Sequence, residues 1–286
     1  MTLIIEPKSK DIGFPVRRLL PAQECQRVGP FIFVDHMGPA KFEKGTTAGD
    51  VRQHPHIGLA TVTFLFSGAM MHRDSLGIVQ RIEPGAINLM TAGRGIVHSE
   101  RMPADVRDEE CDVQGIQTWL ALPVEQEEIA PSFDHYAAEQ IPTVQLAAGF
   151  VRVLIGELEG VKSPVLTHSK TSYFELKLNE NSDYSIDIAG QELAVYLVSG
   201  ELIVNGDRLN ENQLLIGDGV LRLSTGSAPC HAMVLGGEAM EGKRYLHWNF
   251  VSSRLERIKQ ASEDWEQKRF TLVPGETEFI PLPSKI

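Results

Sequence analysis

The feature that most constrains the fold is a steady rhythm of short apolar runs separated by turn residues. Residues 60–66 are rich in β-branched and aromatic side chains, and Ser67-Gly68 follows them directly. Turn signals recur about every ten residues through both halves of the chain, a spacing that is typical of β-barrels and β-sandwiches. The sequence therefore predicts an all-β fold.

The two halves of the chain share this rhythm closely enough to predict a duplication. TVTFLFSGAMMHRDSLG at 61–77 resembles LAVYLVSGELIVNGDRL at 193–209, and both place Ser-Gly after an apolar strand. Between the halves, 123–145 contains three prolines and an acidic patch, and it predicts a solvated connection with a helical turn near 137–140. The patch consists of Glu125, Glu127 and Glu128. We therefore expect two related barrels, over 1–143 and 144–286.

Two turns and one helix can be placed within this plan. Gly38-Pro39 closes a strand that begins at Phe31, and Asn205-Gly206-Asp207 marks a hairpin. Ser252-Ser253 can cap a helix, and four apolar residues follow at helical spacing: Leu255, Ile258, Ala261 and Trp265. The spacing predicts an amphipathic helix over 253–268 that docks against a barrel.

Composition and charge exclude several classes of protein. The net charge is -11, from 38 acidic and 27 basic residues, which argues against a nucleic-acid surface. No apolar run approaches the length of a membrane span, and the first residues do not have the shape of a signal peptide. The three cysteines, Cys25, Cys111 and Cys230, form no C-x-x-C motif. We therefore expect a reduced protein of the cytoplasm.

Two short pairs in the first half carry metal-binding side chains. In an extended strand, residues i and i+2 point to the same face, so His54-Pro55-His56 and His98-Ser99-Glu100 can each aim two ligands into one interior. Three imidazoles and a carboxylate suit a divalent transition metal, and in a six-coordinate site they leave two positions open, either for a bidentate substrate or for a substrate and dioxygen. The pattern predicts a metal site with four ligands: His54, His56, His98 and Glu100.

Other interpretations of these residues stay open. The chain has nine histidines, so one His-x-His pair can arise by chance, and the same ligands can hold a structural zinc ion. A Ser-His-acid triad within 98–100 is excluded, because adjacent strand residues face opposite ways. His72 and Asp74, which follow a strand, are interpreted as a salt link within a hairpin.

Four blocks of the first half stand in a distinctive order: GPFIFVDHMGP (29–39), HPHIGLATVTFLFSG (54–68), HRDSLG (72–77) and MTAGRGIVHSE (90–100). Together they resemble the signature blocks of the pirin family, which belongs to the cupin superfamily. The second half and the helical tail are similar to the pirin C-terminal cupin domain more loosely. The resemblance therefore covers nearly the whole chain.

The resemblance implies a bicupin, with two jelly-roll-like barrels and one metal, usually iron, held by the same four residues in the N-terminal barrel. The C-terminal barrel has no His-x-His pair and is expected to hold no metal. Cupin sites also accept manganese, nickel, copper or zinc, so Fe(II) is favoured among several metals. Many pirins have arginine and glutamate where this chain has Ile57 and Ala60, which changes the groups available to orient a substrate.

Two functions follow from the resemblance. Some pirins open the flavonol quercetin as 2,3-dioxygenases, which implies an enzyme acting on a flavonol- or catechol-like substrate and dioxygen, with Glu100 as the candidate general base. Others, notably the eukaryotic nuclear ones, are redox-sensitive transcriptional co-regulators, which implies a non-enzymatic iron protein that regulates a protein partner. The acidic net charge suits a protein partner better than DNA. Of the two, we expect the dioxygenase.

Overall fold

The computed structural model describes residues 3–217 and 219–283, which fall into two compact units. Within these residues, one unit combines the chain up to Ser9 with Arg17–Asp35 and Glu139–Met240. The other combines Lys10–Val16, His36–Ala138 and the chain from Glu241 onward. Each unit is built mainly from one seven-stranded and one four-stranded sheet, as the all-β cupin prediction requires.

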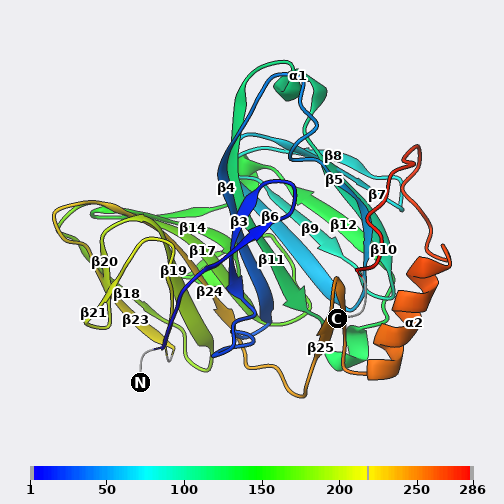
Figure 1. Ribbon diagram of the computed structural model, residues 1–286. Coiled ribbons are helices and arrows are strands. Elements are labelled where there is room, and N and C mark those ends of the chain that lie inside the picture. The colour runs from blue at the N-terminus through cyan, green and yellow to red at the C-terminus, as the bar shows by residue number, and fades with distance from the viewer. Residues whose placement is uncertain (1–2, 218, 284–286) are drawn as a thin grey trace. The chain divides into compact units, whose positions relative to one another are not determined.

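The first barrel contains the two histidine-bearing strands (Figure 1). Its larger sheet has the order β12 (Ser132–Tyr136), β9 (Ile87–Thr91), β6 (Leu59–Ser67), β11 (Cys111–Ala121), β4 (Phe31–Phe42), β3 (Pro15–Leu20) and β2 (Lys8–Asp11). Its smaller sheet has the order β5 (Val51–His56), β10 (Ile96–Arg101), β7 (Met70–Asp74) and β8 (Val79–Ile82).

The second barrel repeats this plan. Its larger sheet has the order β1 (Leu3–Ile5), β22 (Leu214–Gly217), β19 (Glu192–Gly200), β24 (Cys230–Gly237), β17 (Thr171–Leu178), β14 (Gly149–Ile155) and β13 (Thr143–Leu146). Its smaller sheet has the order β18 (Asp183–Asp187), β23 (Val220–Ser224), β20 (Leu202–Val204) and β21 (Asp207–Leu209). The orders correspond strand for strand, with β6–β7 matching β19–β20, in agreement with the duplication predicted from 61–77 and 193–209.

Short elements complete the fold. Two small hairpins pair β15 (Glu157–Leu158) with β16 (Val161–Lys162) and β25 (Tyr245–His247) with β26 (Phe250–Ser252). The helical elements are α1 (Ala104–Arg107), α2 (Leu255–Glu266) and the 3₁₀ turns η1 (Val124–Gln126) and η2 (Ala138–Gln140), the last at the predicted helical turn. Among the described residues, neither α-helix is long and apolar enough to cross a membrane.

The chain crosses between units at both ends, which the predicted boundary at residues 143 and 144 does not capture. The N-terminal strand β1 pairs with β22, so it occupies the sheet position in the second barrel that β12 occupies in the first. The tail from Glu241 onward belongs to the unit that contains His36–Ala138. A boundary drawn along the sequence cannot represent this exchange, because the long-range strand pairing decides it.

Helix α2 forms where the apolar spacing predicted it and packs on the first barrel (Figure 1). Its buried residues, Ile258, Ala261 and Trp265, join a cluster with Ile57, Val97 and Phe250. Leu255, expected on the apolar side, is 42% exposed, because it begins the helix. The serines before the helix make no N-terminal side-chain cap; instead their hydroxyls donate hydrogen bonds to Glu127.

Two expectations for the connections are wrong. Gly38-Pro39 does not end a strand, because β4 continues to Phe42; Gly38 has a φ of 70° and lies so close to the Val113 carbonyl that a Cβ would clash. The acidic patch is not wholly solvated, because Glu127 is buried and forms an ion pair with Arg244 at 2.9 Å. In both places the deciding contact is made with a residue far away in the sequence. Local composition could not predict that this residue lies close by.

Residues 273–280 lie along the two strands that carry the histidines. The side chain of Gln53, on β5, accepts a hydrogen bond from the Val273 amide at 3.0 Å and donates one to the Glu276 carbonyl at 3.2 Å. The Glu276 carboxylate accepts hydrogen bonds from Ser99 at 2.5 Å and from Arg101 at 2.7 Å, both on β10. This C-terminal segment therefore ties β5 and β10 together from outside the site.

Replacing Glu276 with glutamine should destabilise the fold in a pH-dependent way. Burial alone raises the pKa of the Glu276 carboxyl, but hydrogen bonds from Arg101 and Ser99 outweigh it and hold that pKa below its ordinary value. The stabilisation is therefore present above the unfolded-state pKa of about 4.3 and is lost as the pH falls through the lower folded-state pKa. At pH 7 we expect Glu276→Gln to lower the free energy of unfolding by about 1–3 kcal/mol, measured by urea denaturation.

The neighbouring Glu278 provides a matched control, because its side chain is 66% exposed and 3.7 Å from Arg101. Glu278→Gln should change the free energy of unfolding by less than about 0.5 kcal/mol. Equal effects of the two substitutions, or an effect of Glu276→Gln that does not shrink in acid, would contradict this account of the segment.

Candidate metal centre

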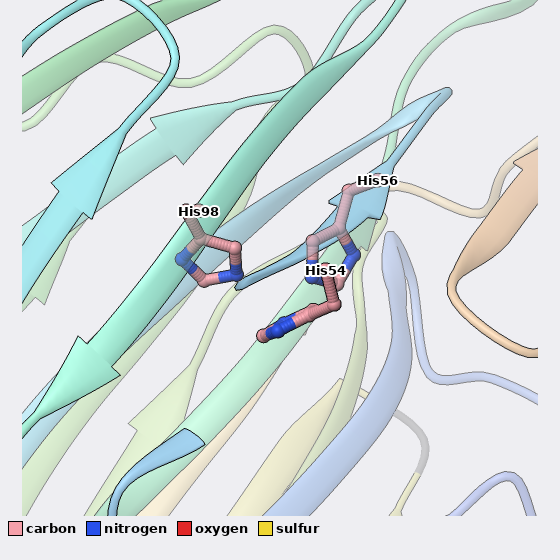
Figure 2. Close-up of side chains that lie close together, drawn as sticks. All are labelled: His54, His56 and His98. Atoms are coloured by element: carbon pink, nitrogen blue, oxygen red, sulfur yellow. The ribbon is translucent and has the colours of Figure 1, made fainter. Parts of the chain in front are cut away.

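Two paired strands of the first barrel bring three histidines together. His54 and His56 lie on β5 and His98 on β10, and the antiparallel register places His98 opposite His54 and Ile96 opposite His56. Each ring offers a nitrogen within 4.8 Å of those of the other two. Figure 2 shows the three rings converging from the two strands. The predicted i and i+2 geometry of His54 and His56 therefore holds.

The ring nitrogens are arranged as metal ligands require. His54 Nδ1 donates to the Arg52 carbonyl at 2.8 Å, which leaves its Nε2 with the lone pair. His98 Nε2 is buried and has no hydrogen-bond partner among the described residues, whereas the backbone of Asn249 hydrogen-bonds to His56. An unpartnered buried polar atom costs about 1–3 kcal/mol. A bound metal ion would remove this cost, so the three histidines fit such an ion.

Burial keeps all three imidazoles neutral. Loss of hydration lowers the pKa of His54 to about 4, although the hydrogen bond to the Arg52 backbone opposes the shift. The same cause, reinforced by the neighbouring histidines, puts the pKa values of His56 and His98 well below the ordinary value. Neutral imidazole is the form that binds a metal, so the site is prepared for an ion at neutral pH.

Glu100 lies beside this group without being part of it. The β5–β10 register shifts after His98, so Glu100 pairs with Val51 across a bulge, a feature often found next to functional sites. Its carboxylate is buried, and it accepts a hydrogen bond from Gln117 at 2.8 Å. Burial raises the pKa of Glu100, and hydrogen bonds from Gln117 and Thr63 oppose that rise. The structure thus gathers three of the four predicted ligands and holds the fourth through Gln117.

The opposite wall of the site comes from β11, whose residues the sequence analysis did not connect with the histidines. Trp119 packs against His56 in an edge arrangement, with ring centroids 5.1 Å apart. Gln117, two residues earlier, shares that face and reaches Glu100. The sequence does show that Gln117 and Trp119, two residues apart, lie on the same face of a strand. It does not show that this face lines the site with the histidines.

The two departures from the family pattern lie outside the histidine group. Ile57 is buried in the cluster beneath α2, on the strand face opposite His56. On β6, Thr61 and Thr63 lie on one face, and Thr63 hydrogen-bonds to Glu100. Ala60 lies on the other face of the strand. Ile57 and Ala60, which stand where the resemblance leads one to expect arginine and glutamate, therefore do not face the three imidazoles.

Adding a divalent metal to the metal-free protein should raise its unfolding temperature. A ligand that binds only the folded state stabilises it by about 2.7 kcal/mol at a concentration 100 times its Kd. His98→Ala should abolish the shift, because it removes one of three converging nitrogens, whereas His247→Ala, on β25, should retain it. Thermal unfolding followed by circular dichroism measures both, and a full shift in His98→Ala would contradict the site.

Family comparisons agree with this architecture. Residues 13–120 match the pirin family model, and residues 173–271 match the model of the pirin C-terminal cupin domain. The first match contains all three clustered histidines.

Individual relatives cover almost the whole chain. A pirin-like protein of Caulobacter vibrioides is 41% identical, over 98% of this chain and 99% of the relative. Mouse pirin is 30% identical, over 94% of this chain and 92% of its own. The crystal structure of a quercetin 2,3-dioxygenase from Acinetobacter baumannii superposes with a TM-score of 0.90 at 32% identity, covering 100% of this chain and 97% of that one. The chain therefore belongs to the pirin family.

Proposed function

We propose that this protein is a metal-dependent dioxygenase that opens a flavonol- or catechol-like substrate with dioxygen, as a quercetin 2,3-dioxygenase does. The observation that carries the proposal is the buried group of three neutral imidazoles, whose ligand nitrogens lie within 4.8 Å of one another. The full-length similarity to the Acinetobacter baumannii enzyme supports it. A metal ion that is held by only a few protein ligands keeps coordination positions free for small molecules. This is the arrangement of catalytic metal sites, whereas structural sites are fully coordinated by the protein.

We propose Fe(II) as the metal, with His54, His56, His98 and Glu100 as its ligands. When bound, the ion supplies positions at which an ionised substrate hydroxyl and dioxygen come together. Manganese, nickel, copper and zinc suit the same imidazoles, so the metal present depends on supply as well as on the ligands. The three cysteines are free thiols, which suits the reducing cytoplasm where we place the protein.

Glu100 is the residue we propose for proton transfer. Its raised pKa makes the carboxylate a stronger base toward a substrate hydroxyl than an exposed glutamate would be. Gln117 and Thr63 hydrogen-bond to the carboxylate, which fixes the Glu100 side chain. Trp119 covers His56 and reduces the access of water to this end of the site.

Glu100→Gln should lower turnover far more than metal content. The amide has nearly the shape of the carboxylate but is not a base, and a positioned base contributes about 10²- to 10⁴-fold to a rate. Oxygen uptake with quercetin measures the rate, and elemental analysis measures the metal. The control Glu83→Gln, at a 61% exposed side chain, should change neither. Equal loss of metal and turnover in Glu100→Gln would limit Glu100 to a ligand role.

The whole proposal is tested by metal content and oxygen uptake on one anaerobically purified sample. About one iron per chain with quercetin-dependent uptake, lost in His56→Ala, is the result we expect. Iron without oxygen uptake would contradict the enzyme and favour the alternative function, a redox-responsive binding protein that contacts a protein partner. A full complement of zinc without uptake would indicate a structural ion, and absence of any metal would overturn the site.

A further inference from the structure

A buried chain of three side chains runs from β7 to the metal centre. His72 Nε2 lies 3.0 Å from Asp74 Oδ2, and His72 Nδ1 lies 3.4 Å from His98 Nδ1. The exposed fractions of Asp74, His72 and His98 are 0%, 4% and 2%. The pairing of β7 with β10 sets this arrangement, because it places Asp74 opposite His98 and His72 opposite Glu100. The predicted contact between His72 and Asp74 is present as a hydrogen bond, and His72 in turn contacts a candidate ligand.

The orientation of the Asp74 carboxyl group, at the end of this chain of side chains farthest from the metal centre, is fixed by hydrogen bonds. Asp74 Oδ1 accepts hydrogen bonds from the backbone amides of Leu76 at 2.9 Å and Ile78 at 3.1 Å, which orients the carboxyl group. A carboxylate only accepts hydrogen bonds, so Oδ2 requires a proton on His72 Nε2. In the neutral ring, His72 Nδ1 then carries the lone pair.

The tautomer of His72 in turn sets the tautomer of His98. The lone pair on His72 Nδ1 accepts the proton of His98 Nδ1, so the other nitrogen of His98, Nε2, carries a lone pair. Nε2 is the atom of His98 that has no hydrogen-bond partner among the described residues. The ring of Phe133 stacks on His72, with centroids 4.3 Å apart and planes 20° apart, and prevents the imidazole from turning.

We propose that Asp74 and His72 are positioning residues that select the tautomer of His98 and present its Nε2 lone pair to the metal. This inference rests on the metal centre proposed above. The backbone carbonyl of Arg52 does the same task for His54 and cannot be altered by substitution. For His98 the task falls to side chains, so the tautomer can be reversed by changing one atom of Asp74.

Asp74→Asn is the substitution that tests the chain. Its Oδ1 can stay on the two backbone amides, which turns the new NH₂ group toward His72 Nε2. That nitrogen must then accept, the proton of His72 moves to Nδ1, and His98 Nδ1 becomes the acceptor. His98 Nε2 is left protonated where a ligand lone pair is needed. We expect metal affinity to fall about 10- to 100-fold, as for other residues that orient metal ligands, with folding retained.

The tautomer itself is read in the metal-free protein. Long-range ¹H–¹⁵N NMR of imidazole-labelled protein should show His98 protonated at Nδ1 in the wild type and at Nε2 in Asp74→Asn. Fe(II) and Ni(II) affinities are measured by chelator competition. Asp112→Asn is the matched control, since its Oδ2 accepts a hydrogen bond from Ser67 at 2.6 Å on the exposed end of β11. It should change neither the tautomer nor the affinity.

Substitutions of His72 separate an acceptor role from simple packing. His72→Gln keeps an acceptor for His98 Nδ1 and should retain most of the affinity, whereas His72→Leu removes it and should lose about 10- to 100-fold. Wild-type affinity in Asp74→Asn, or an unchanged His98 tautomer, would overturn the inference while leaving the metal site intact. A wild-type protein that binds no metal would instead refute the metal centre, whatever tautomer the NMR spectrum shows.

Discussion

The pairing of β5 with β10 is the contact on which the rest of the site depends. Its register places His98 opposite His54, and the pleat of each strand sends the histidines to one face while Pro55 and Ser99 turn to the other. A slip of one residue in this pairing would turn one set of ligands away from the interior. The geometry of the three imidazoles is therefore a property of backbone hydrogen bonds more than of the histidines themselves.

Other parts of the chain hold these two strands from both sides. On the outer face, α2 packs over Ile57 and Val97, and residues 273–280 bond to Gln53 and Ser99, each adjacent in sequence to a candidate ligand. On the inner side, β7 and β11 supply the side chains that contact His98, His56 and Glu100. A buried ring nitrogen without a hydrogen-bond partner, such as Nε2 of His98, opposes folding in the absence of metal. The support from both sides explains how the two strands can still hold the imidazoles in register.

The two barrels carry different inward-facing side chains on the same topology. The strands of the second barrel that correspond to β5 and β10 are β18 and β23, and they direct Ile186, Leu221 and Leu223 into an apolar cluster. Apolar side chains at these positions contribute burial free energy directly. In the first barrel the equivalent strands carry buried polar groups, whose burial is favourable only with a partner. The strand plan is thus shared, and the inward-facing residues differentiate the barrels.

The sequence by itself determined the fold class, the duplication, the tail helix and the facing of each histidine, because all of these follow from local periodicity and turn chemistry. It also indicated the metal centre, since i and i+2 spacing in a strand is fixed by the backbone. Only the tertiary structure decided which barrel the tail covers, that β1 completes the second barrel, and that Glu100 bonds to Gln117. The link from Asp74 through His72 to His98 belongs to the same class, because it depends on which strands become neighbours and not on any spacing along the chain.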